Sequence, residues 1–528
     1  MEQVSEAWKE AQLQDIVPVS YIEITFNIGD PYAQADVSSS GETTSYGKVQ
    51  QVATEVDKQY LPYATLEHNH WMLDGTFNIY GDKPLQDTGF VSPIICNEKA
   101  LFYRKPVIVL NFTEVHTNLV AGLTITWSKA FDECARDFKI TAYNGEEIVA
   151  TKTVTGNVDN VSVVDIDLIN YNRIEIEIIE WCLPLKRARV EEILVGIEKV
   201  FTKTDLMKYT HEQYADIISG DLPKNSIVFE IDNSDQQYNP DNPQGVYKYL
   251  LERQKLTVKY GYKLDNDIEW IKGGTFYTSE WVASQNGITA QFTARDLLEF
   301  MTEKYIAKTV TITLYNLATE ALTQANLPLN SDGSVKWILD ESLKNISVKT
   351  TTDLNYTIAE ILQLVANAGK CVLFQDRNGI LHIEPINDIL TDYIINRFNS
   401  YQNADYEVTK ELKSVDVNDG MGIATNSNSG EIQTVKNDLI QNSTVATNVA
   451  EWIKDVLKHR KTLNGEYRAD PRLDVLDKIT VINKFATNTV IVTDVKYEYE
   501  GSFKGSYEGR VIDDWFDLWQ NKYRYCKA

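Results

Sequence analysis

The sequence predicts a mainly β protein with minor α structure. Short segments in which apolar and polar residues alternate recur along the chain between turn residues, as half-buried strands do. The 29 tyrosines, 10 tryptophans and 17 phenylalanines add side chains that strands favour. Apolar residues at helical spacing are clear in few segments. At about 150 residues per domain, the 528 residues predict three or four domains.

The first sixty residues predict a short helix, a strand and a loop. The charged segment 1–15 favours a helix, and residues 21–28 (YIEITFNI) alternate as a strand does. Residues 30–60 are polar and rich in Ser, Thr, Gln and Gly, with little periodicity. They predict a long excursion or flexible loop.

Residues 63–196 predict a separate β block. Its expected strands are 106–112, 122–127, 138–143, 147–154, 161–168 and 173–179. Turn residues such as Asn144 and Gly145 separate them. Many short strands at this spacing favour a sandwich or jelly roll over a parallel sheet.

Strands resume after Gly196. They are expected at 227–231, 255–262, 273–282 and 288–294, followed by a helical stretch from Arg295 to Met301. Asp296 stands where its carboxylate can accept first-turn amides. The Asn- and Asp-rich segment 232–243 lacks the glycine and the glutamate that an EF-hand loop needs, which favours a structural loop of Asx turns.

Two helices and a hairpin are expected further on. Residues 357–369 place apolar residues on one face, with a capping-box spacing of Thr357 and Glu360. A hairpin follows with its turn at 376–379, and a second helix is expected at about 446–460. The tail returns to strands at 478–482 and 489–500.

Composition excludes several classes of protein. A hydrophobic share of 43% argues against disorder of the whole chain, and the net charge of −25 argues against a surface that grips nucleic acid or an anionic membrane. No apolar run approaches the ~18 residues of a membrane span, and the N-terminus lacks the apolar core of a signal peptide. The five cysteines form no CxxC pair, which favours a reduced folding compartment.

No catalytic, nucleotide-binding or metal-binding motif is present, so we expect no enzyme activity, no cofactor and no metal. Glu67, His68 and His70 lack the further ligands that zinc requires. A pair of carboxylates for glycoside hydrolysis stays open among 76 acidic residues, because sequence does not give their separation.

Aromatic residues in 63–92 allow two interpretations. Trp71 and Phe90, with Asp74 nearby, could form a shallow sugar site, in which rings stack on a pyranose and a carboxylate fixes its hydroxyls. Alternatively, Trp71 and Phe90 close one end of the sandwich, which is favoured because large aromatic residues are usually interior.

Six segments beyond residue 197 form a distinctive series: IVFEIDNSDQQYNPDNPQGVYKYLLERQKLTVKYGY (227–262), GGTFYTSEW (273–281), ITAQFTARDLLEF (288–300), AEILQLVANAGKCVLFQDRNGILHIEPI (359–386), EYRADPRLDVLDKITVI (466–482) and YEYEGSFKGSYEGRVI (497–512). In this order they resemble the tail-hub proteins of tailed bacteriophages and phage-tail-like particles. Within 63–196, YATLEHNHWMLDG, GFVS, PVIVLNFTEVHTN, GLTITW, YNRIEIEI and RARVEEILVG are similar to the galactose-binding-like (discoidin-like) sandwiches inserted in some tail proteins.

The resemblance implies tube-like β-barrel domains, an inserted β-sandwich and a small α/β domain. The expected domains are 1–62, the helix and first part of tube-like domain I; 63–196, the inserted sandwich; 197–304, the rest of domain I; 305–404, the α/β domain; and 405–528, tube-like domain II with a helix.

The function implied by the resemblance is a structural hub. It would form a homotrimeric ring that adapts the sixfold tail tube to the threefold tip, with a tail tube or distal tail protein and a spike or fibre protein as partners. We expect it in the virion, assembled in the host cytoplasm, with DNA only as passing cargo. An acidic lumen would repel DNA phosphates during passage.

Two alternatives stay open. The first is a tail-tip adsorption protein that binds host cell-wall glycan through the sandwich, with Trp71, Asp74, Phe90 and His116 as candidate contacts. The second is a hydrolase that degrades the cell wall.

Overall fold

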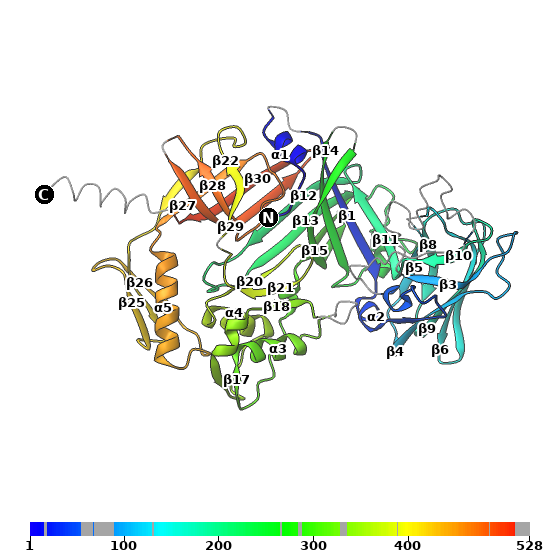
Figure 1. Ribbon diagram of the computed structural model, residues 1–528, viewed down its shortest axis with the longest axis horizontal. Helices are drawn as coiled ribbons and strands as arrows, with labels where there is room; N and C mark the ends of the chain where they lie inside the picture. Colours follow the sequence, from blue (N-terminus) through cyan, green and yellow to red (C-terminus); the bar gives the residue numbers. More distant parts are fainter. Residues whose placement is uncertain are drawn as a thin grey trace, which may run out of the picture.

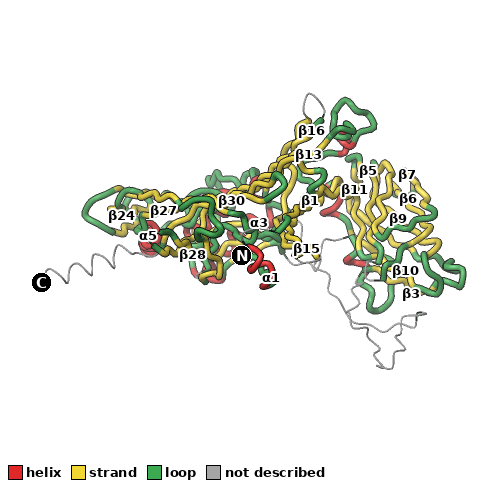
Figure 2. Tube along the Cα trace, turned by 90° about the horizontal axis from the view of Figure 1, so that it is seen from above, coloured by secondary structure: helices red, strands yellow, loops and turns green. Residues whose placement is uncertain are grey.

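The chain folds into an elongated, mainly β molecule in this computed structural model (Figures 1 and 2). The structure describes residues 1–14, 18–53, 67, 89–128, 131–264, 267–283, 288–327, 335–387, 389–484 and 486–512. Strands account for 49% and helices for 14%. The predicted fold class, mainly β with minor α, is confirmed.

One long sheet of 15 strands forms the middle of the molecule. Its strands are β1 (Ser20–Gly29), β5 (Val120–Thr126), β8 (Val161–Leu168), β11 (Glu192–Thr202), β12 (Leu206–Tyr214), β13 (Lys224–Asp232), β14 (Lys255–Leu264), β15 (Asp267–Ala283), β16 (Thr289–Arg295), β22 (Leu390–Ile395), β23 (Asp405–Val408), β27 (Lys461–Tyr467), β28 (Lys478–Ile482), β29 (Thr487–Tyr499) and β30 (Phe503–Val511). They run in the order β23-β27-β30-β29-β12-β13-β16-β15-β14-β1-β11-β5-β8, and β28 joins β22 to β29.

The sheet unites two sections that are far apart in sequence. The first section is β1 with β11–β16, the second is β22, β23 and β27–β30, and they meet where β12 pairs with β29. The sheet curls, because Tyr209 of β12 hydrogen bonds Tyr260 of β14 although three strands separate them. Among the described strands the path stays open, so the tube-like barrels expected from the resemblance are curled, continuous parts of one sheet rather than closed barrels.

A sandwich lies at one end of this sheet (Figure 1). Its outer layer is the sheet β2-β4-β9-β6-β7. Its further strands are β2 (Ser38–Ser40), β3 (Phe90–Ile95), β4 (Val107–His116), β6 (Ala135–Asn144), β7 (Glu147–Val154), β9 (Tyr171–Trp181) and β10 (Arg187–Val190). Buried residues of β4, β6 and β9 pack against those of β5, β8 and β11 in one apolar core. The inner layer of the sandwich is therefore an extension of the main sheet.

Residues 30–53 belong to this sandwich, so the expectation of a flexible loop there is wrong. They form α2 (Pro31–Asp36), β2 and a 3₁₀ turn at Val49–Gln51. Ala33 and Val52 are fully buried in the sandwich core, and Val52 accepts a hydrogen bond from the amide of Ile193 (2.7 Å). The apolar residues of this segment are spaced too irregularly to form a periodic pattern. They are ordered because they pack into a core formed with strands that are distant in sequence.

Strand β11 connects the sandwich to the first section. Residues 192–195 of β11 pair with β5, whereas residues 196–202 pair with β1. Gly196 faces Gly29 at the change of partner, where a Cβ atom on Gly196 would lie 2.6 Å from the Cα of Gly29. The two glycines allow the strands to approach more closely than side chains would permit.

A further group of helices and strands forms an α/β unit, which lies below the main sheet in the view of Figure 1. They are β17 (Val310–Thr313), α3 (Leu314–Gln324), β18 (Trp337–Leu339), β19 (Ser347–Thr350), α4 (Ile358–Ala368), β20 (Val372–Gln375), β21 (Leu381–Glu384), β24 (Leu412–Val417), β25 (Gly422–Thr425), β26 (Glu431–Val435) and α5 (Ser443–Leu457). All share one apolar core, so residues 412–457 pack with the α/β unit rather than with the second section that surrounds them in sequence.

Several local predictions are confirmed. The N-terminal helix is α1 (Glu6–Gln12), and α4 begins with the capping box of Thr357 and Glu360. The turn at 376–379 joins β20 to β21. Segment 232–243 is a loop of side-chain-to-backbone hydrogen bonds, with Asn233 accepting from the amide of Tyr238. The stretch after Arg295 is a 3₁₀ helix, Leu297–Phe300, capped by Asp296.

Candidate functional site: the open polar face of the main sheet

The face of the main sheet turned away from the apolar core is polar over strands of both sections. We call it the open face. Alternation produces it, since Tyr209 and His211 on β12 point into the core whereas Thr210 and Glu212 point outward. Its members are Lys208, Thr210, Glu212, Lys224, Ser226, Val228, Glu230, Gln291, Asp405, Asn464, Glu466, Asp494, Lys496, Glu498, Ser506 and Glu508.

The pairing register arranges these side chains in rows across the strands. In one row Glu466 lies opposite Ser506, Ser506 opposite Lys496, and Lys496 opposite Glu212. Two adjoining open grooves follow the rows, with volumes of about 520 and 380 Å³, and they share Glu212, Ser226 and Lys496 in their walls. The open face is thus a continuous polar surface that crosses the seam between β12 and β29.

The open face carries an excess of negative charge. Seven carboxylates and three lysines line the grooves. Lys496 lies 3.0 Å from Glu212 and 3.2 Å from Glu498, and the hydrogen bond to Glu212 raises its pKa. Partial burial raises the pKa of Asp494 and of its cross-strand partner Glu508, and for Glu508 the charge of Asp494 adds to this effect. The surface therefore favours water and cations over anions.

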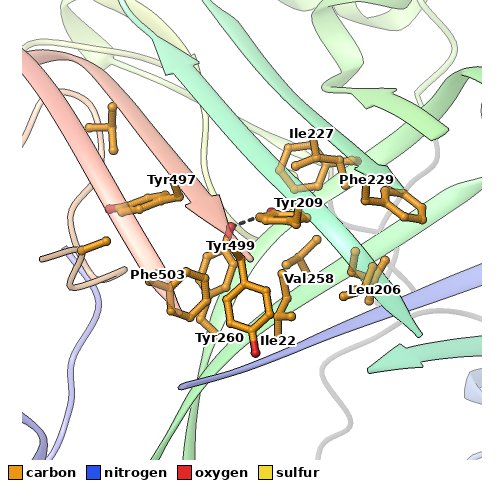
Figure 3. Packing of buried hydrophobic residues seen from close by; sticks show 14 of the residues in the cluster. Ile22, Leu206, Tyr209, Ile227, Phe229, Val258, Tyr260, Tyr497, Tyr499 and Phe503 are labelled. Atoms are coloured by element: carbon orange, nitrogen blue, oxygen red, sulfur yellow. Dashed lines mark hydrogen bonds between the residues drawn. The ribbon is translucent and has the colours of Figure 1, made fainter. Parts of the chain in front are cut away.

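A layer of buried aromatic residues supports the open face from below (Figure 3). The Tyr260 hydroxyl lies 2.7 Å from the Tyr209 hydroxyl and 2.8 Å from Nδ1 of His211. Nε2 of His211 lies 2.8 Å from the Asn225 side-chain oxygen. Burial lowers the pKa of His211 to about 4, so the ring is neutral at pH 7. The Tyr260 ring also packs edge-on against Phe503 of the second section, with centroids 5.2 Å apart.

Arg377 fixes the α/β unit to this layer. It lies in the β20–β21 turn and bonds the Asp474 carboxylate, while its other nitrogens donate to the backbone oxygens of Lys272, Pro471 and Leu473. Burial opposes the charge of Arg377, but Asp474 raises its pKa above the ordinary value. Gln213 donates to the same carboxylate from β12 (3.2 Å).

Two of the four predicted glycan contacts, Phe90 and His116, are among the described residues, and both are buried. Phe90 is 0% exposed, and its ring lies in the sandwich core. His116 is 8% exposed, lies 3.0 Å from Asp36 and packs against Phe112 and Tyr171. Trp71 and Asp74 fall outside the described residues, so a role of these two in glycan binding stays a prediction.

The described part of the expected Glu67–His70 group has a different environment. Glu67 is buried, accepts from the amide of Arg187 and pairs with the buried guanidinium of Arg189. His68 and His70 lie outside the described residues. Among the residues that the structure describes, no group of three or more His, Cys, Asp or Glu side chains is arranged to hold a metal.

Sequence reasoning did not single out the residues of the open face. Glu212, Asp494 and Lys496 each lie in a strand of alternating burial, which is the signal that could have identified them as outward-pointing. Which strands would lie side by side depends on pairing between residues more than 270 positions apart, such as Glu212 with Lys496. None of the described helices is long and apolar enough to cross a membrane.

Comparison with known proteins gives the following. No protein-family model and no curated protein matches the chain. Among solved structures, the chain is similar to the 43 kDa tail protein of prophage MuSo2 from Shewanella oneidensis, with 13% identity, a TM-score of 0.42 and coverage of 59% of this chain and 94% of that one. A tail protein from Neisseria meningitidis has 12% identity and a TM-score of 0.40, with coverage of 60% of this chain and 93% of that one. Prophage tail protein gp18 from Listeria monocytogenes has 12% identity and a TM-score of 0.39, with coverage of 63% of this chain and 97% of that one. These three solved structures are all tail proteins, and two of them belong to prophages.

Proposed function

We propose that the chain is a structural hub of a phage or phage-like tail. Three copies form a ring that adapts the sixfold tail tube to the threefold tip, and the open face lines the channel through which DNA passes. Its partners are further copies of itself, a tail tube or distal tail protein and a spike or fibre protein. The protein resides in the virion after assembly in the host cytoplasm.

The observation that carries this proposal is the continuous, acidic open face shared by the two β-sections. A channel wall must be hydrated and must not bind the phosphates that pass it. With seven carboxylates against three lysines in its grooves, this surface repels a polyanion within about 10 Å, the Debye length at 0.1 M salt. The buried aromatic layer behind the open face suits a wall that keeps its shape.

The free edge of the sheet supports self-association. Strand β23 pairs with β27 on one side, and all four of its residues are exposed. Tyr406 and Val408 are 46% and 63% exposed, and no described strand pairs with the outer side of β23, so within the described residues apolar side chains and unpaired backbone groups lie together at this edge. Such an edge pairs readily with another chain, and a neighbouring subunit would cover it.

Electron microscopy of the purified chain, alone and with its tail tube protein, tests the ring. We expect particles with threefold symmetry whose inner wall is formed by the open face. A chain that stays monomeric under both conditions would refute the hub.

A DNA-retention assay tests the channel separately. In the assembled ring, the variant Glu212→Lys with Glu230→Lys and Glu498→Lys should retain double-stranded DNA at 50 mM salt, whereas the wild-type ring releases it, because the change reverses the charge of the wall. The matched control replaces three other glutamates by lysine, namely Glu146, Glu147 and Glu341, which are exposed on the sandwich and the α/β unit. Equal DNA retention by both variants would place the open face outside the channel.

A further inference from the structure

Two thiols face each other at one end of the outer sandwich layer. Cys134 directly precedes β6, and Cys182 directly follows β9. These strands are antiparallel, and Ala135 pairs with Trp181, so Cys134 and Cys182 form the next opposed pair. The amide of Cys182 donates to the carbonyl oxygen of Cys134 (3.0 Å), and the amide of Cys134 donates to Sγ of Cys182 (3.2 Å).

Both thiols lie in a largely buried environment, in which Sγ of Cys134 lies 4.0 Å from the backbone oxygen of Asn157. Burial raises the pKa of Cys134 to about 12, and the neighbouring Cys182 adds to this rise. Burial also raises the pKa of Cys182. Both residues are free cysteines, Cys134 buried and Cys182 partly exposed. Opposed residues of an antiparallel pair have Cα atoms about 4.5–5.5 Å apart, which falls within the range of about 4.4–6.8 Å that a disulfide spans.

We propose that Cys134 and Cys182 form a redox modification site, at which a small-molecule disulfide converts the two thiols into a cross-strand disulfide. The inference depends only on the geometry of the sandwich and does not rest on the proposed tail function.

The reaction is two successive thiol–disulfide exchanges. The more accessible Cys182 thiolate attacks one sulfur of oxidised glutathione, which forms a mixed disulfide and releases one glutathione. The Cys134 thiolate then attacks Sγ of Cys182, which forms the protein disulfide and releases the second glutathione. The protein loses two electrons and two protons, and the two released glutathione molecules carry them. The high thiol pKa makes both steps slow, because the thiolate is the nucleophile.

Cys96 is a second candidate partner for Cys182, because it contacts the residue that follows Cys182. It lies at the end of β3, and its thiol donates to the backbone oxygen of Leu183 (3.3 Å), while the amide of Lys186 donates to its sulfur (3.3 Å). Cys96 therefore bonds the turn that follows Cys182, whereas Cys134 lies opposite Cys182 in the strand register. Cys371 is fully buried between α4 and β20 and serves as a distant control.

The disulfide would close the 48-residue separation between the two positions and tie together β6 and β9, the central strands of the outer layer. A reducing cytoplasm keeps the pair open during folding, and an oxidising exterior closes it. Because the cross-link restricts the unfolded chain, it stabilises the sandwich without altering its native contacts.

Incubation of the full chain with oxidised glutathione, followed by thiol titration in denaturant, tests the site. We expect two of the five cysteine thiols to disappear and peptide mapping to find one Cys134–Cys182 link. The sandwich should unfold at a temperature higher by about 10 °C, and a reductant should reverse both changes. That reversal is measured on the wild-type protein and so does not depend on whether a variant folds.

Variants identify the two partners. Cys182→Ser should form no link, Cys134→Ser should stop at a glutathione adduct on Cys182, and Cys371→Ser should behave as the wild type. Five free thiols after oxidation of the wild type, a stable adduct without a link, or a Cys96–Cys182 link would each overturn the proposal.

Discussion

Buried Arg377 and partly exposed Asp474 form an ion pair at the point where three parts of the protein meet. Nε of Arg377 lies 2.8 Å from Oδ2 of Asp474, and a terminal guanidinium nitrogen lies 2.8 Å from Oδ1. Arg377 belongs to the β20–β21 turn of the α/β unit, and Asp474 to the connection between β27 and β28 in the second section. The same guanidinium bonds the backbone of Lys272 on β15, in the first section. One side chain thus holds all three parts together.

Replacement of Arg377 by methionine should strongly destabilise the protein. It leaves the Asp474 carboxylate, whose side chain is 21% exposed, without its cation, and removing one partner of such a largely buried pair costs about 3 kcal/mol, the lower end of the range for buried pairs. Urea unfolding followed by tryptophan fluorescence measures the loss. Arg104→Met is the control, because Arg104 and its partner Glu42 are 66% and 63% exposed, and this pair should contribute less than about 1 kcal/mol. Similar losses in the two variants would contradict a special role for Arg377.

His211 should make the protein less stable in mild acid. The unfolded chain binds a proton near pH 6.5, whereas the folded protein does not until about pH 4, because burial lowers the pKa of His211. The contribution of His211 to the free energy of unfolding is therefore complete above pH 6.5, and it falls by about 3 kcal/mol as the pH drops to 4. Urea unfolding at pH 7 and pH 4 should show a smaller acid loss for His211→Gln than for the wild type. An equal loss in both proteins would exclude His211 as the cause.

Asp296 should have the opposite effect to His211 and make the protein less stable as the pH rises. Burial raises its pKa to about 7, and its Oδ2 atom has no hydrogen-bond partner within the described parts of the chain. The folded state holds a proton that the unfolded state loses near pH 4, so the charge of Asp296 destabilises the fold increasingly from pH 4 to 7. Asp296→Asn, which keeps an oxygen for the amide of Glu299, should match the wild type at pH 4 and exceed its stability by about 4 kcal/mol at pH 8. Urea denaturation of both proteins at these two pH values measures the difference. A difference in unfolding free energy that is the same at both pH values would refute the role of the Asp296 charge.

Gly196→Ala should disturb the change of partner along β11. The new Cβ atom would lie 2.6 Å from the backbone oxygen of Ile28, and the backbone at Gly196 has φ of +151°. We expect a loss of about 3 kcal/mol and faster hydrogen exchange in residues 192–202. Gly145→Ala is the control, because Gly145 has nothing within 4 Å of the added atom and strains only its own φ of +59°. It should lose about 1 kcal/mol without affecting β11.

Local patterns in the sequence predict much of the strand and helix content. Alternation in 161–168 predicts β8 with the bounds that the structure has, because the period of two depends only on the strand itself. In 147–154 the Ile, Val and Thr residues, which favour strands, predict β7 with its observed bounds. The capping box likewise predicts the start of α4, since it involves side chains three residues apart.

Long-range packing accounts for the predictions that are wrong or missing. Segment 30–53 becomes ordered through partners such as β4, whose Leu110 lies opposite Ser39. Residues 412–457 join the α/β unit through contacts such as the hydrogen bond from Asn437 to Asn367 (2.9 Å). Arg377 gave no sign of its role, because its acceptor lies 97 positions away.

The division of β11 between two partners has a mechanical consequence. A pull on the sandwich does not act on a hinge, because the strand bonded to β5 continues directly as the strand bonded to β1. The load enters the main sheet along the strand axis and is shared in shear by successive hydrogen bonds of the β1–β11 ladder. Tension at the outer end of the molecule therefore reaches its centre without a compliant joint.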